Sequence, residues 1–101
     1  MKQLALPTTK EAANRVWDIL VTHAGAPNDE PGWARAQFVY HFTQGTISEY
    51  RFQGNLGSGG KFWCDRFEGW RVTCYPEDET VERREMIAVT NAVLRELLEE
   101  L

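Results

Sequence analysis

The chain has 101 residues, 43% of them apolar, and 15 acidic against 11 basic side chains give it a net charge of −4. This length and composition indicate one folded domain, residues 1–101, and exclude both a disordered chain and a second core. The acidic balance argues against direct nucleic-acid binding by the surface as a whole. No apolar run approaches the ~20 residues of a membrane helix and no signal segment is evident, so we expect a cytoplasmic protein without a membrane partner.

The first predicted element is an amphipathic helix over residues 9–24. Thr8 and Glu11 have the spacing of a capping box at its start, and Gly25 ends it. Its apolar residues recur at helical spacing: Ala13, Val16, Trp17, Leu20 and Ala24. Trp17 lies within this stripe, and two roles stay open for it: a core residue, or one whose ring lines a ligand pocket.

The middle of the chain is predicted to form two β-hairpins. From residue 36 the apolar period changes to two, which indicates strands over 36–43 and 46–53. A three-residue turn with Gly45 in its left-handed position would join them. This register places Phe38 opposite Tyr50 on one face.

The second hairpin is predicted from strands over 61–66 and 70–75, joined by a turn at 67–69. The expected pairs are Phe62 with Cys74, Cys64 with Val72, Asp65 with Arg71 and Lys61 with Tyr75. The two cysteines are too few for a disulfide framework and lack Cys-x-x-Cys spacing, so we expect reduced thiols.

The last predicted element is a long helix over 81–101, which contains neither Gly nor Pro. Its N-cap is Asp78 or Thr80. Asn91 lies on its apolar stripe, so it either binds a loop backbone or fixes oligomer register, or it contacts a ligand. The predicted fold class is therefore α+β, with an N-terminal helix, a four-stranded antiparallel sheet of two hairpins, and a long C-terminal helix.

Residues 54–63 form the most distinctive segment, because four of the ten are glycine. Arg51 precedes the glycines of this segment and Lys61 follows them. The backbone N–H groups of such a glycine loop can form an anion-binding nest. The alternative is that the glycines only allow tight passage of the backbone. A nucleotide-hydrolysing P-loop is excluded, because Asn55 replaces the first required glycine and Phe62 follows the lysine.

One face of the predicted sheet gathers polar and aromatic side chains: His41, Glu49, Arg51, Lys61, Trp63, Asp65, Arg71 and Tyr75. This face is either simply solvated, or it binds an anion through its cations while Trp63, Trp17 or Tyr75 stacks on a base. The sequence contains no Ser-His-Asp order, reactive Cys-His pair or metal-ligand spacing. We therefore expect a protein that is not an enzyme and has no cofactor and no metal.

The second half of the chain carries a series of short motifs: Arg51-Phe52-Gln53-Gly54, Leu56-Gly57, Gly59-Gly60-Lys61-Phe62, Cys74-Tyr75-Pro76-Glu77-Asp78-Glu79-Thr80, Glu82-Arg83, Met86-Ile87 and Asn91. This pattern resembles a recurrent family of short phage and prophage proteins. Ser58 stands where such proteins usually carry an aromatic residue, which removes one stacking surface. Within that group the chain is similar to the Thoeris anti-defence sponge family.

That similarity implies a non-catalytic homo-oligomer that sequesters a cyclic nucleotide or cyclic ADP-ribose-type immune signal at subunit interfaces in the host cytoplasm. It implies base contacts from Trp17 and Phe62, phosphate contacts from Arg51 and Lys61, and a base or ribose contact from Asn91. The full set of candidate ligand-binding residues is Trp17, Arg51, Gly57, Gly59, Gly60, Lys61, Phe62, Trp63, Arg71 and Asn91.

Two other functions stay open from the sequence. One is a protein-directed inhibitor of a CRISPR effector or host polymerase, in which the acidic segments 77–82 and 96–100 imitate nucleic-acid charge. The other is a small structural or regulatory phage dimer assembled through the C-terminal helix.

Overall fold

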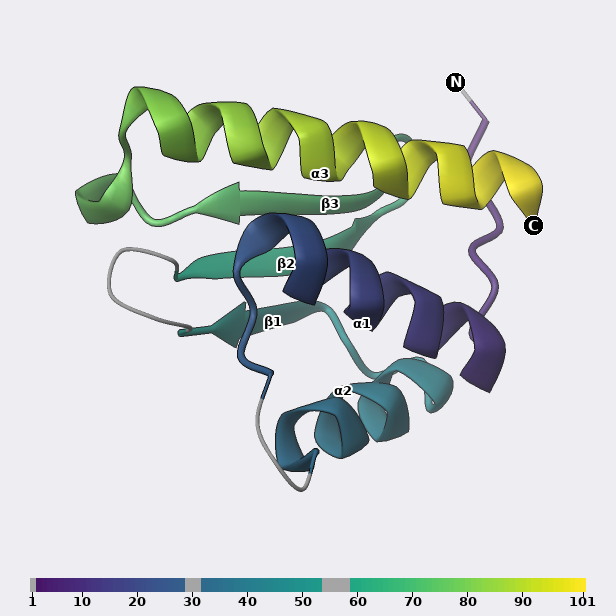
Figure 1. The fold of residues 1–101 in the computed structure, drawn as a ribbon. Helices are drawn as coiled ribbons and strands as arrows, with labels where there is room; N and C mark the ends of the chain where they lie inside the picture. The colour runs from purple at the N-terminus through teal and green to yellow at the C-terminus, as the bar shows by residue number, and fades with distance from the viewer. Residues whose placement is uncertain (1, 29–31, 54–58) are drawn as a thin grey trace.

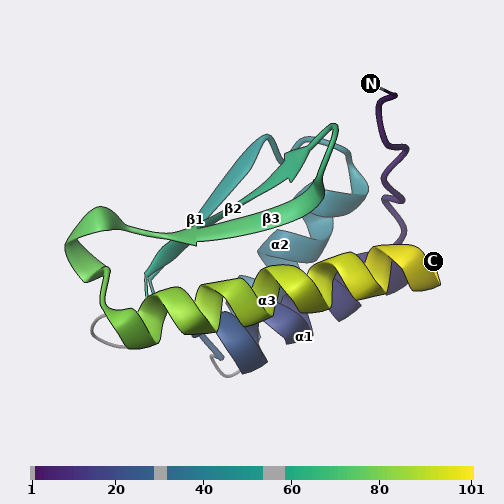
Figure 2. The ribbon, with the colours of Figure 1, turned by 90° about the horizontal axis from the view of Figure 1, so that it is seen from above.

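The computed structural model describes residues 2–28, 32–53 and 59–101. Its elements are α1 (Lys10–Ala24), α2 (Trp33–Thr43), β1 (Glu49–Phe52), β2 (Gly60–Asp65), β3 (Gly69–Cys74), the short 3₁₀ helix η1 (Pro76–Asp78) and α3 (Val81–Glu100). The strands form an antiparallel sheet in the order β1-β2-β3, with α3 running along β3 (Figure 1). In Figure 2, α1 and α3 lie on the same side of this sheet.

The α+β class and both terminal helices are confirmed, but the described part of the chain has a three-stranded sheet instead of the predicted four strands. In those same residues, no helix combines the length and the apolar character needed to span a membrane.

Helix α1 begins one residue later than the sequence predicts. The side chain of Thr9, not Thr8, accepts a hydrogen bond from the Ala12 N–H at 3.1 Å. Glu11 then occupies the second helical position, one short of the place that a capping box requires. The helix ends at Gly25, whose φ of +78° suits a residue without a Cβ. Helix α3 is preceded by Thr80, one of its two predicted N-caps, whose side chain accepts a hydrogen bond from the Arg83 N–H at 3.0 Å.

The predicted strand over 36–43 is wrong, because these residues belong to helix α2. Helical spacing places Phe38 and Phe42 on one buried side, whereas Tyr40, which strand alternation would bury with them, is 62% exposed. The charged residue of this helix, Arg35, turns to α1, where it bonds to Asn14 and pairs with Asp18. Packing against both α1 and the sheet thus selects the helix.

Gly45 has the left-handed conformation that the predicted turn requires, with φ of +68°, but it ends a helix instead of joining two strands. The Thr46 N–H donates to the His41 carbonyl and the Gly45 N–H donates to the Phe42 carbonyl, both at 3.1 Å. This pair of bonds is the Schellman motif of a helix C-terminus. The left-handed glycine was therefore predicted correctly, but the element that precedes it is a helix and not the predicted strand.

The hairpin of β2 and β3 is confirmed with a register shifted by two residues. Phe62 pairs with Val72, and Asp65 pairs with Gly69. The carboxylate of Asp65 accepts from the Phe67 and Glu68 N–H groups at 2.8 and 2.9 Å, so the turn closes at Gly69, where φ is +94°. Because the shift is two residues, every side chain keeps its predicted face.

Phe38 lies at the centre of an aromatic cluster that joins the helices to the sheet. Its ring centroid lies 5.1 Å from that of Trp17, 5.3 Å from Tyr50 and 5.4 Å from Phe62. The predicted proximity of Phe38 and Tyr50 is therefore present, although a helix supplies one of the two rings. Edge-on and tilted aromatic pairs of this kind add about 0.5–1.5 kcal/mol each beyond area burial.

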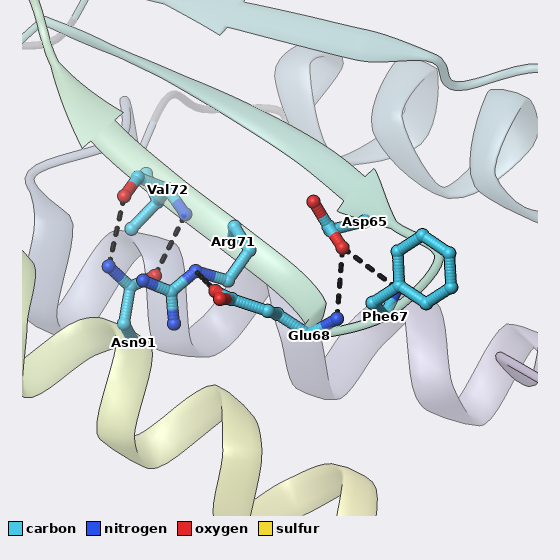
Figure 3. A network of polar contacts seen from close by, with 6 residues as sticks. All are labelled: Asp65, Phe67, Glu68, Arg71, Val72 and Asn91. Carbon is cyan, nitrogen blue, oxygen red and sulfur yellow. Dashed lines mark hydrogen bonds and ion pairs between the residues drawn. The ribbon is translucent and has the colours of Figure 1, made fainter. Parts of the chain in front are cut away.

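Helix α3 closes the outer edge of β3 through one side chain. The Asn91 amide accepts from the Val72 N–H at 2.8 Å and donates to the Val72 carbonyl at 3.0 Å (Figure 3). It therefore occupies the hydrogen-bonding positions that a fourth strand would use at this point. The structural role proposed for Asn91 is present, with a strand backbone as its partner.

Replacing Asn91 by Leu should destabilise the fold by about 2–4 kcal/mol, because two hydrogen bonds disappear and the buried Val72 backbone loses its partners. The melting temperature should fall by about 10 °C or more. Amide exchange at Val72 should accelerate beyond the global effect. Gln37→Leu, which alters an exposed amide on α2, is the control. Unchanged protection of Val72 would contradict the edge-closing role.

The pKa of Asp65 lies below its ordinary value, chiefly because its carboxylate accepts the Phe67 N–H and then the Glu68 N–H. The stabilisation from this carboxylate is therefore complete above the ordinary aspartate pKa and disappears as pH falls through the lowered folded-state pKa. Chemical denaturation should show wild type more stable than Asp65→Ala at neutral pH, with the gap closing in acid. Glu77→Ala controls for loss of an exposed carboxylate; a gap that is independent of pH would refute the turn-capping role.

Candidate functional site

The side of the sheet that faces away from α1 and α3 carries the odd-numbered strand residues, and we call it the outer face. It consists of Glu49, Arg51, Lys61, Trp63, Asp65, Arg71 and Thr73. Arg51 lies opposite Lys61, and Trp63 lies opposite Arg71. Four predicted site residues from three strands are thus neighbours on one solvent-facing surface.

Glu49 is the local anion that holds two of these cations. Its carboxylate lies 3.0 Å from Arg51 Nε and 3.6 Å from Lys61 Nζ. The hydrogen bond from Arg51 is the main cause that lowers the pKa of Glu49, and Lys61 adds to it. Because such exposed pairs contribute only about 0–1 kcal/mol, a stronger anion can displace the carboxylate.

Trp63 is the half-exposed aromatic residue at the centre of the outer face. Lys61 Nζ lies 5.2 Å from the centroid of its ring, within the range of a cation–π contact. On the neighbouring strand, Arg71 pairs with Glu68 at 3.3 Å and lies beside Asn91 (Figure 3). The indole thus has cationic side chains on its own strand and on the next one.

Two of the predicted aromatic contacts lie in the core. Trp17 is 1% exposed and Phe62 is 0% exposed, and both pack against Phe38. In this structure neither ring has surface for stacking on a ligand base. For Trp17, the role as a core residue is the one that the structure shows.

The predicted glycines fall into two groups. Gly57 lies outside the described residues. A Cβ on Gly59 would lie 2.8 Å from the Tyr75 ring, and one on Gly60 would lie 2.7 Å from the Thr73 carbonyl oxygen. Close packing therefore explains glycine at 59 and 60, as the tight-passage alternative requires.

Sequence reasoning missed Arg83, which is 3% exposed and donates from Nη2 to the Gly59 carbonyl at 3.0 Å. Burial lowers the pKa of Arg83 below its ordinary value. This hydrogen bond connects the start of α3 to the residue that precedes β2, two positions before Lys61. The signal for it was its position on the buried stripe of α3, seven residues before Thr90 and eleven before Leu94.

The surface formed by the described residues has two larger grooves. The one between α1 and α2, of about 950 Å³, contains none of the predicted site residues. The other, of about 600 Å³, lies between β3 and α3 and contains both Arg71 and Asn91. Two predicted residues from distant segments are therefore brought together at the second groove, although the first is larger.

The chemistry available on these surfaces is binding by cations and an aromatic ring. Burial raises the pKa of Cys64 to about 11, which keeps its thiol protonated and weakly nucleophilic at neutral pH. Within the described ranges, no group of three or more His, Cys, Asp or Glu side chains is placed to hold a metal ion.

No family model, no curated protein and no solved structure matches this chain.

Proposed function

We propose that the protein is a non-catalytic binding module that sequesters a small anionic nucleotide, of the cyclic nucleotide or cyclic ADP-ribose type. The observation that carries this proposal is the placement of Arg51, Lys61 and Arg71 around the half-exposed ring of Trp63. The resemblance to phage anti-defence sponges suggests the class of ligand and a homo-oligomeric, cytoplasmic form.

The ligand base stacks on Trp63, since an aromatic ring offers every base a π-face. Its phosphates replace Glu49 between Arg51 and Lys61, where the planar guanidinium supplies parallel hydrogen bonds and the ammonium a point charge. Arg71 is 3.3 Å from its own exposed partner Glu68 and can be redirected in the same way. The ligand is held without turnover, as the resemblance to the sponge family implies.

The direct test is a thermal-shift screen of the purified protein with cyclic nucleotides and cyclic ADP-ribose isomers. A ligand at 100 times its dissociation constant adds about 2.7 kcal/mol, which raises the melting temperature by on the order of 10 °C. Trp63→Leu should weaken binding about tenfold through lost stacking. Trp33→Leu is the matched control, because Trp33 is 66% exposed on α2.

Equal weakening by Trp63→Leu and Trp33→Leu would refute the assignment of the outer face. The absence of any shift across the screen would refute the small-ligand proposal. Sensitivity of the biological activity to acid-to-Lys changes on α3 would then favour the protein-directed inhibitor.

Removing the carboxylate of Glu49 should strengthen binding. In Glu49→Gln, Arg51 and Lys61 no longer have the anion that occupies them, so nucleotide affinity should rise about two- to fivefold. Isothermal titration calorimetry measures the change. Glu11→Gln makes the same change in net charge on α1, and an equal gain in that variant would mean that only the overall charge matters.

A further inference from the structure

The groove between β3 and α3 adjoins the outer face along Arg71 and Thr73, which belong to both. It has a volume of about 600 Å³ and is lined mainly by α3 on one side and β3 on the other. Its walls combine apolar side chains, including Ile87 and Ala88, with three cationic side chains and one carboxylate, that of Glu79. This composition suits a ligand that has both an apolar body and charged groups.

Three arginines line this groove, Arg71 from β3 and both Arg84 and Arg95 from α3. Arg84 and Arg95 are 11 residues apart, close to three helical turns, so they lie on one face of α3 with a rise of about 16 Å between them. The chain as a whole has a net charge of −4. Three guanidinium groups in one groove therefore make a local positive surface on an acidic protein.

All three guanidinium groups are accessible to an anion. Arg84 lies 3.5 Å from Glu79 and Arg71 lies 3.3 Å from Glu68; Arg84 and both carboxylates are exposed, and Arg71 is partly exposed. Ion pairs at the surface are weak, so these exchange readily for a stronger anion. Arg95 has no ion-pair partner among the residues that the structure describes, which leaves its guanidinium to solvent.

The groove stays open because the side chains at its floor are small and because the polar side chain of Asn91 is already hydrogen-bonded. Ala88 and Ala92 face it from α3. Asn91 turns to the Val72 backbone, so its amide fixes the helix to the strand and does not extend across the groove (Figure 3). The guanidinium of Arg71 lies beside Asn91 (Figure 3). Asn91 and Arg95 are four residues apart in α3, which is about one helical turn. Cations thus lie at both ends of the groove, with the uncharged side chains of Ala88, Asn91 and Ala92 between them.

We propose that this groove binds an extended dianion, a ligand with two phosphate or carboxylate groups joined by an apolar or planar spacer. One anionic group binds between Arg71 and Arg95, and the other binds at Arg84. Guanidinium groups suit both kinds of anion, because they present paired donors in a plane. This site goes beyond the nucleotide-binding outer face and shares Arg71 with it.

The test is a titration of the ¹⁵N-labelled protein, followed through the arginine Nε–Hε signals. The bis(methyl phosphate) diester of 1,10-decanediol probes the phosphate form, a linear ten-carbon dicarboxylate probes the carboxylate form, and the ten-carbon monocarboxylate controls for charge number. At least one dianion should bind saturably and shift the signals of Arg71, Arg84 and Arg95. The monocarboxylate should bind about tenfold more weakly, because one charge-assisted contact is missing.

Arg95→Glu should weaken dianion binding by about tenfold or more. Arg66→Glu makes the same change of charge at an exposed position in the β2–β3 turn and should stay within about twofold of wild type. The two variants should keep wild-type circular dichroism, because both side chains are exposed. No saturable binding of either dianion, or equal weakening by Arg66→Glu, would overturn the proposal.

Trp63→Leu separates this site from the proposed nucleotide site. Dianion binding that is insensitive to Trp63→Leu and lost in Arg95→Glu supports the groove, whatever the outcome of the nucleotide screen. Weakening by Trp63→Leu equal to that by Arg95→Glu would place the dianion on the outer face, which would refute the groove and leave the nucleotide proposal standing.

Discussion

The packing of Phe38 against Trp17, Tyr50 and Phe62 is the constraint on which the arrangement of this protein depends. It joins α1, α2, β1 and β2 at one point, and it commits the even-numbered side chains of the strands to the interior. Since successive strand residues point to opposite sides, the odd-numbered ones must face outward. The cationic outer face is therefore a geometric consequence of the aromatic core.

Much of this arrangement could be predicted from the sequence, and α2 shows why the rest could not. Its apolar residues surround the helix, so helical periodicity is nearly absent and the alternation of Phe38, Tyr40 and Phe42 imitates a strand. What decides between the two is tertiary: Phe38 and Phe42 need one buried side, and Arg35 needs the polar side chains of α1. Local patterns do not contain that information.

The candidate site likewise divides into features that local patterns predict and features that tertiary packing decides. The prediction that Arg51, Lys61, Trp63 and Arg71 share a face depends only on odd and even positions, so it survives a register error of two residues. The roles of Trp17 and Phe62 depend on what packs over them, and both are covered by the core. Arg84 and Arg95 were missed for a related reason, because the face that α3 turns to the sheet is set by its docking.

Asn91 contributes to that docking, and it also limits what can be recognised at this edge. By bonding to both backbone groups of Val72, it occupies the point where an added strand would pair with β3. A partner peptide would have to displace this contact before it could extend the sheet. The same contact holds Arg84 and Arg95 of α3 alongside Arg71 of β3. Recognition here therefore depends on side-chain cations, which favours a small charged ligand over a pairing backbone.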